Sequence, residues 1–132
     1  MIRLIPMILL TGCVVYSNKP PANSPPWFEY ADGGCFWDGA YEDYVWYFDV
    51  DVNDDLGPGD VMYVWADVYD TRSGRLEDSF ELAPEPGRSW YSAWLGSSTW
   101  LDPAWPWYEI VISAEDSEGA VGSVSLYPEP CW

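Results

Sequence analysis

The sequence contains no histidine, and only five of its 132 residues are lysine or arginine. Without histidine the chain cannot build a Ser-His-Asp triad, a Cys-His pair or a histidine-ligated zinc site, and it lacks the usual pH-sensing side chain. The single lysine, Lys19, lies near the N-terminus, and no Gly-x-Ser-x-Gly or phosphate-cradling glycine-rich motif is present. A pair of carboxylates is the catalytic arrangement that remains, and among so many acids some pair will be close by chance. We therefore expect a protein that is not an enzyme.

The shortage of basic residues is matched by an excess of acidic ones. Aspartate and glutamate total 22, which gives a formal net charge of −17. Such a field repels phosphate backbones, so nucleic acid is not expected as a partner. The chain should nevertheless fold, because disorder also requires low hydrophobicity and here 48% of residues are hydrophobic and 18% aromatic. The length predicts one domain.

Long hydrophobic runs are also missing, and the apolar run near the N-terminus, Leu4 to Leu10, is far shorter than the roughly 20 residues that span a bilayer. The start, "MIRLIPMILLTGC", has a basic residue, an apolar run and then small residues before Cys13, which is the order of an export signal. Its last four residues, Leu-Thr-Gly-Cys, resemble the lipobox of bacterial lipoproteins. The resemblance implies a signal peptide over residues 1–12 and lipidation of Cys13; an ordinary secretory leader with a free cysteine is the alternative.

The residues after Cys13 are rich in proline, serine and asparagine, which is typical of a semi-extended tether. We expect this tether over residues 13–26 and a folded domain over residues 27–132. In lipoproteins of Gram-negative bacteria an aspartate after the lipidated cysteine marks retention at the inner membrane, and here that position is Val14. The resemblance therefore implies a lipid anchor in the cell outer membrane, with the domain facing the periplasm or the cell surface.

If Cys13 carries lipid, Cys35 and Cys131 remain as an even pair. In an exported chain such a pair favours a disulfide, here one that joins the start of the domain to its end. Two free thiols are the alternative.

Hydrophobic residues alternate with polar ones along most of the chain after Trp27. In "YVWYFDVDV" one face carries Trp46, Phe48, Val50 and Val52, and in "VMYVWADVYD" one face carries Met62, Val64, Ala66 and Val68. We expect these two strands to pair as a hairpin. Further strands follow, with Leu76, Phe80 and Leu82 pointing inward in one and Tyr108, Ile110, Ile112 and Ala114 in another. Frequent turn signals predict an all-β, antiparallel sandwich of about seven strands.

Two stretches resemble bacterial immunoglobulin-like domains of the polycystic-kidney-repeat type: "WYFDVDVNDDLGPGDVMYVWADVYD" is similar to their central hairpin and "YEIVISAEDSEGAVGSVSL" to their last hairpin. The resemblance implies a single immunoglobulin-like β-sandwich. It also implies that Tyr108 is a corner tyrosine whose hydroxyl bonds to nearby backbone.

The acidic stretch "FDVDVNDDLGPGD" is a candidate calcium loop. An EF-hand register fails, because Asp54 stands where the sharp turn requires glycine. A loop site of Asn53, Asp54, Asp55 and Asp60 remains as the hypothesis, so Ca²⁺ is the one cofactor that we consider. A solvated acidic turn that discourages edge pairing is the alternative.

Tryptophan is abundant, with ten residues in this small chain. Alternation predicts that Tyr63, Trp65 and Tyr69 point outward, and Trp94 lies in a later aromatic-rich region. Exposed rings beside carboxylates can hold sugars, so these four residues are candidate ligand-binding residues. The alternative is that the rings only cover the sheet by packing on one another.

Together these observations predict a membrane-anchored, extracytoplasmic binding, adhesion or envelope-structural module with a protein or glycan partner. A carbohydrate-binding module with calcium support is the alternative function.

Overall fold

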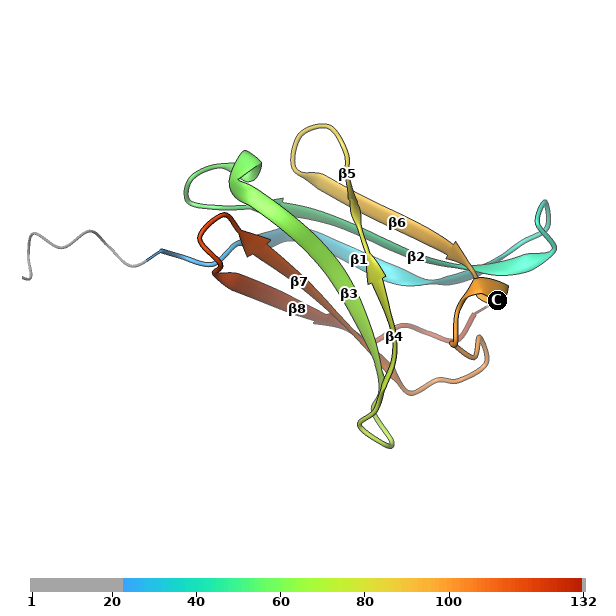
Figure 1. Cartoon of the computed structure of the whole chain (residues 1–132). Helices are drawn as coiled ribbons and strands as arrows, with labels where there is room; N and C mark the ends of the chain where they lie inside the picture. Colours follow the sequence, from blue (N-terminus) through green and yellow to red (C-terminus); the bar gives the residue numbers. More distant parts are fainter. Residues whose placement is uncertain (1–22, 132) are drawn as a thin grey trace, which may run out of the picture.

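A computed structural model describes residues 23–131, and these residues fold as two antiparallel sheets of four strands each (Figure 1). The strand orders are β1-β2-β6-β5 and β4-β3-β7-β8. The strands are β1 (Trp27–Asp38), β2 (Asp43–Asn53), β3 (Val61–Asp70), β4 (Leu76–Glu81), β5 (Ala83–Pro84), β6 (Ser89–Leu95), β7 (Tyr108–Asp116) and β8 (Val121–Leu126). Two short 3₁₀ turns, η2 (Pro58–Asp60) and η3 (Gly96–Ser98), lie in the connections. This is the strand order of an immunoglobulin-like sandwich, so the predicted fold class is confirmed.

The predicted hairpin between β2 and β3 is wrong. β2 pairs with β1 and β6, whereas β3 pairs with β4 and β7 in the other sheet. Both strands have one strongly apolar face, and in different sheets these faces point toward each other in the core. The connection over residues 54–60 therefore crosses from one sheet to the other.

The core follows the predicted alternation closely. Trp46, Phe48, Val50 and Val52 of β2 are buried, and so are Val64, Ala66 and Val68 of β3 and Tyr108, Ile110, Ile112 and Ala114 of β7. Burying alternate residues of each strand leaves the remaining side chains on the two outer faces. These outer faces therefore hold the side chains that are available for binding.

Two residues that were expected in the core are exposed, Met62 and Leu76. The pairing of β3 with β7 shifts register between Val61 and Tyr63, and this irregularity turns Val61 inward in place of Met62. A second shift, in the pairing of β3 with β4, places Leu76 on the outer side. Because side chains alternate along a strand, a shift by one residue exchanges the inner and outer positions.

Tyr108 stands at the start of β7 and fulfils the corner role that the resemblance implied. Its ring is buried and lies edge-on to Trp46, with 5.8 Å between ring centroids. Its hydroxyl accepts a hydrogen bond of 2.8 Å from the backbone amide of Asp102. The bond ties the loop before β7 to the core of the sandwich.

Cys35 of β1 and Cys131 are joined by a disulfide, as predicted, with 4.9 Å between their Cα atoms. The bridge attaches the segment after β8 to the first strand. The amide of Cys131 also donates a 2.9 Å hydrogen bond to the carbonyl of Pro103. The end of the chain is thus held against the loop before β7 as well as against β1.

Residues 23–26, the last part of the predicted tether, lie against the sandwich. The Asn23 side-chain amide donates to the Asp116 carboxylate at 2.7 Å, and Pro26 is buried. A Cβ atom on Gly122 of β8 would lie 2.0 Å from the Pro26 carbonyl oxygen, so only glycine allows this approach. The predicted signal peptide and Cys13 lie outside the described residues. Within residues 23–131 the structure contains no helix long and apolar enough to cross a membrane.

Candidate functional site

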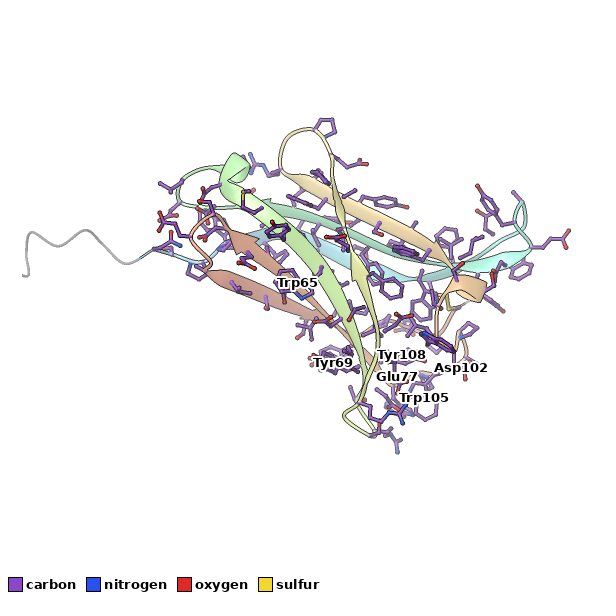
Figure 2. All side chains as sticks on the ribbon, in the orientation of Figure 1. Trp65, Tyr69, Glu77, Asp102, Trp105 and Tyr108 are labelled. Atoms are coloured by element: carbon purple, nitrogen blue, oxygen red, sulfur yellow. A yellow bond between two sulfur atoms is a disulfide. The ribbon has the colours of Figure 1, made fainter. Side chains whose placement is uncertain are left out.

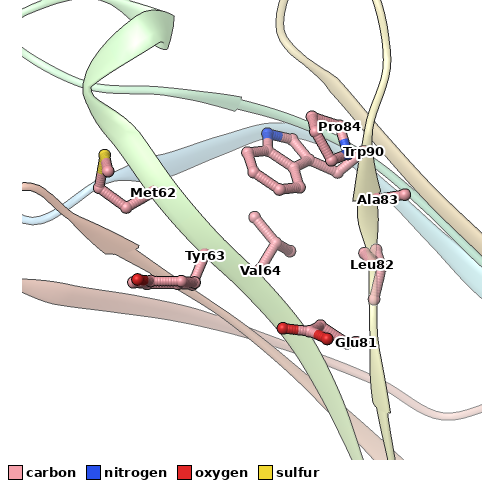
Figure 3. A pocket seen from close by; sticks show the side chains of 8 residues that line it. All are labelled: Met62, Tyr63, Val64, Glu81, Leu82, Ala83, Pro84 and Trp90. Carbon is pink, nitrogen blue, oxygen red and sulfur yellow. The ribbon is translucent and has the colours of Figure 1, made fainter.

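A groove of about 400 Å³ lies where the chain passes from β4 to β5 and so changes sheet (Figure 3). Its walls come from the start of β3, from the β4–β5 segment and from β6. The lining residues are Met62, Tyr63, Val64, Glu81, Leu82, Ala83, Pro84 and Trp90. β5 has only two residues, so this side of the sandwich is covered by side chains rather than by a full strand.

A second groove of about 390 Å³ adjoins the first and shares Tyr63 and Glu81 with it. It lies over the outer face of the β4-β3-β7-β8 sheet. Tyr63 of β3 stands directly opposite Glu115 of β7, and Trp65 stands directly opposite Glu81 of β4. Directly opposite residues have Cβ atoms about 5 Å apart, so each ring lies beside a carboxylate. We call these four residues, Tyr63, Trp65, Glu81 and Glu115, the aromatic–acid face.

The four predicted ligand-binding residues do not form one site. Tyr63 and Trp65 line the second groove, and Tyr63 is 56% exposed. Tyr69 is on the same strand but lies well apart from Trp65 (Figure 2). Trp94 belongs to the other sheet and packs on Phe80, with 5.6 Å between ring centroids. Two of the four predicted residues therefore line one groove, together with two glutamates that the prediction did not include. The glutamates were missed because the register that brings them opposite the rings depends on which strands pair.

Three carboxylates gather at the end of the sandwich where residue 23 enters. Asp54 follows β2, Asp60 precedes β3 and Asp116 ends β7, and their ligand oxygens all lie within 4.8 Å of one another. Asp54 and Asp116 are only 3% and 2% exposed. We call Asp54, Asp60 and Asp116 the acidic triad.

The acidic triad contains only two of the four residues that were predicted to form a metal site. Asp54 and Asp60 come together as expected, but Asp55 is exposed and Asn53 contacts Glu29 instead. The missed residue is Asp116, and its signal lies in the alternation: it continues the buried series of β7, as Asp54 continues that of β2. Both series run toward the same end of the molecule (Figure 1). An aspartate at the next buried position of β2 and of β7 was therefore the sequence signal that these two carboxylates meet.

The pKa values of Asp54 and Asp116 are shifted in opposite directions. Burial raises the pKa of Asp54 to about 6, and the neighbouring Asp55 and Asp116 add to this effect against a hydrogen bond from the Leu56 amide. For Asp116 burial also acts upward, but hydrogen bonds from Asn23 and from the Ala120 and Glu118 amides outweigh it and lower the pKa. Of these two carboxyls, Asp54 is thus the one whose charge the fold disfavours in the absence of a cation.

Calcium-free stability should therefore respond to pH through Asp54. Its pKa is about 6 in the folded state and about 3.9 in an unfolded chain. Its protonated form favours folding, so the contribution is complete below about pH 4 and is lost as the pH rises through 6. The asparagine of Asp54→Asn cannot titrate, so the variant does not lose this contribution. The difference in melting temperature, variant minus unchanged chain, should therefore increase between about pH 4 and pH 7 in EGTA. A difference that is constant with pH would contradict this expectation.

No known protein family matches this chain, and no curated protein is similar to it. A solved crystal structure described as an engineered protein, a structural genomics target, is similar in fold, with a TM-score of 0.51 and 18% sequence identity. The match covers 86% of this chain and 21% of that protein. The chain thus spans about a fifth of the length of the structure that it resembles, and the similarity concerns the sandwich alone.

Proposed function

We propose that this protein is a lipid-anchored, extracytoplasmic binding module that holds a carbohydrate on its aromatic–acid face and catalyses no reaction. The observation that carries the proposal is the pairing of Tyr63 with Glu115 and of Trp65 with Glu81 on one groove-bearing sheet. An aromatic ring offers a flat surface to the apolar face of a sugar, and a carboxylate beside it accepts hydrogen bonds from sugar hydroxyls.

The arrangement of the rings favours an extended ligand over a single sugar. Tyr63 and Trp65 are two residues apart on β3, which places them about 6.6 Å apart along the strand. The adjoining first groove continues from Tyr63 toward Met62 and Trp90. A short oligosaccharide laid along this line would contact both rings and at least one carboxylate.

The negative charge of the protein limits the class of carbohydrate that the aromatic–acid face is expected to bind. The chain carries a net charge of −17, and two carboxylates stand on the face itself. Anionic polysaccharides would meet repulsion at long range and again on contact. Neutral and amino sugars are therefore the expected ligands.

The anchor is proposed from the N-terminal sequence. "LTGC" matches the residues that surround the lipidated cysteine of bacterial lipoproteins, and a lipid on Cys13 would hold the domain at the outer membrane. The proline-rich residues that follow would set the domain off from the bilayer. A binding module in this position would attach the envelope to a glycan.

The experiment uses full-length protein extracted in detergent. Mass spectrometry should find a chain that starts at Cys13 and carries acyl groups. The same preparation is then titrated with neutral oligomers of glucose and of N-acetylglucosamine and with peptidoglycan fragments. Tryptophan fluorescence should change on binding, because Trp65 lies in the groove. Tyr63→Ala and Trp65→Ala should each weaken binding about tenfold, which is about 1.4 kcal/mol.

Two matched variants serve as controls. Trp100→Ala and Tyr41→Ala remove exposed rings of the same kinds from loops outside the groove and should leave affinity unchanged. Unchanged affinity in both Tyr63→Ala and Trp65→Ala would refute the carbohydrate proposal. The absence of a fluorescence change with every oligosaccharide tested would also refute it. That result would leave adhesion to a protein or an envelope-structural role as the function.

A further inference from the structure

The acidic triad contains two buried oxygen atoms to which no group of residues 23–131 donates a hydrogen bond. In Asp54 and in Asp60, one carboxylate oxygen accepts a hydrogen bond. Asp54 Oδ1 accepts from the Leu56 amide at 3.1 Å, and Asp60 Oδ1 accepts from the Ser117 hydroxyl at 2.5 Å. The other oxygens, Asp54 Oδ2 and Asp60 Oδ2, are buried and have no hydrogen-bond partner in the described part of the chain. A buried carboxylate oxygen without a partner is costly, so these atoms indicate a missing positive ligand.

Asp116 is fastened more completely than its two neighbours. Its Oδ1 accepts from the amides of Glu118 and Ala120, each at 2.9 Å, and its Oδ2 accepts from Asn23. Its carboxylate is therefore rigid before any ligand arrives. Carboxylates that are fixed by hydrogen bonds in this way are pre-organised for a metal ion, because their orientation does not have to be established on binding.

No basic side chain within residues 23–131 supplies the missing positive charge. Among residues 23–131 there are three basic side chains, and each is engaged elsewhere: Arg75 pairs with Glu77, Arg88 pairs with Glu29, and Arg72 lies over the Trp107 ring. Three carboxylates within 4.8 Å of one another repel strongly when they are ionised. Protonation of Asp54 is one way to reduce this repulsion, and binding of a cation from solution is another.

We propose that Asp54, Asp60 and Asp116 bind one calcium ion. Calcium takes oxygen ligands at 2.3–2.6 Å, so two ligands of one ion are at most about 5.2 Å apart, and the observed separations fit within this limit. Zinc prefers nitrogen and sulfur ligands, which the triad lacks. Magnesium retains several waters and requires shorter distances in strict octahedral geometry, which suits a closely set buried triad less well.

The ion would join three segments that are distant in the sequence. Asp54 and Asp60 flank the β2–β3 loop, Asp116 opens the β7–β8 turn, and Asn23 brings the N-terminal segment to the same carboxylate. The close approach of Pro26 to Gly122 holds that segment along β8. Calcium would therefore stiffen the point at which the N-terminal segment enters the domain. This inference is independent of the carbohydrate proposal, because no residue is shared between the two sites.

The test is a calcium titration of the full chain in detergent at pH 7 after treatment with EGTA. Calorimetry should find one ion per chain with a dissociation constant of about 10⁻⁴ to 10⁻³ M, the range of extracellular calcium modules. Ten millimolar calcium chloride should raise the melting temperature by about 5 °C. Sodium chloride at equal ionic strength is the essential comparison, because screening alone stabilises a chain this acidic.

Variants separate the site from the general charge. Asp54→Asn should weaken calcium binding at least tenfold and abolish the calcium-specific rise in melting temperature. Glu118→Gln removes one charge from an exposed side chain in the same turn and should retain both. Asp60→Asn serves as a second variant should Asp54→Asn fail to fold. A rise no larger than that in sodium chloride, or one that Asp54→Asn and Asp60→Asn keep, would overturn the proposal.

Discussion

Replacing Cys35 and Cys131 together with alanine is expected to lower the free energy of unfolding by about 4 to 5 kcal/mol. The bridge spans 96 residues, nearly the whole folded part of the chain. Closing so long a loop removes many conformations from the unfolded ensemble, and this effect increases with loop length. A domain of this size has a total stability of about 5–15 kcal/mol, so the reduced protein should be only marginally folded.

The measurement is urea unfolding of the oxidised chain and of the double variant, followed by tryptophan fluorescence. Unchanged protein kept in a reducing agent should match the double variant, because both lack the bridge. Cys13→Ala removes the cysteine that takes no part in the bridge and should leave stability unchanged. A loss below about 1 kcal/mol in the double variant would mean that the bridge constrains the unfolded chain far less than the loop length requires.

Phe48→Ala is expected to destabilise the sandwich by about 3 to 5 kcal/mol. Phe48 has no exposed surface and packs on Phe80 with 5.1 Å between ring centroids. It thus joins β2 of one sheet to β4 of the other. Removing the ring leaves a cavity between two sheets that are held apart by other large side chains, so the space cannot close.

The matched control for this substitution is Phe36→Ala on the neighbouring strand β1. Phe36 points outward, is 40% exposed and contacts Tyr47 at 5.8 Å between ring centroids. Its loss should cost less than about 1.5 kcal/mol. Equal losses for the two variants in urea unfolding would show that the ring of Phe48 does not act as a joint between the sheets.

At the end of the sandwich that holds the acidic triad, core packing favours apolar residues, whereas cation binding requires carboxylates. The buried series of β2 and β7 continue into Asp54 and Asp116, where an apolar residue would add to the core. Burial disfavours the charge of Asp54 and so reduces the stability of the cation-free protein, whereas hydrogen bonds stabilise the charge of Asp116. A binding site often carries such a cost, and here calcium binding would offset it.

Much of the fold could be predicted because the alternation of residues within a single strand shows which of its faces is buried. The alternation of β2 identified Trp46 and Phe48 as core residues, and that of β7 did the same for Ile110 and Ile112. The inner and outer positions of a strand depend on its own residues and on the burial of one face. Met62 and Leu76 were the exceptions, because a register shift is a property of two paired strands and leaves no mark in either one alone.

The amino-acid sequence by itself therefore determined an all-β chain, the side chains that fill its core, a disulfide between Cys35 and Cys131 and an outward-facing Tyr63 and Trp65. Only the tertiary structure decided that β2 and β3 lie in different sheets, that Glu81 and Glu115 stand beside those rings, and that Asp116 joins Asp54 and Asp60. The physical reason is the sequence separation of the residues that decide each feature. A strand's faces follow from neighbours a few residues away, whereas strand pairing and the meeting of carboxylates depend on how two sheets bury their apolar faces against each other.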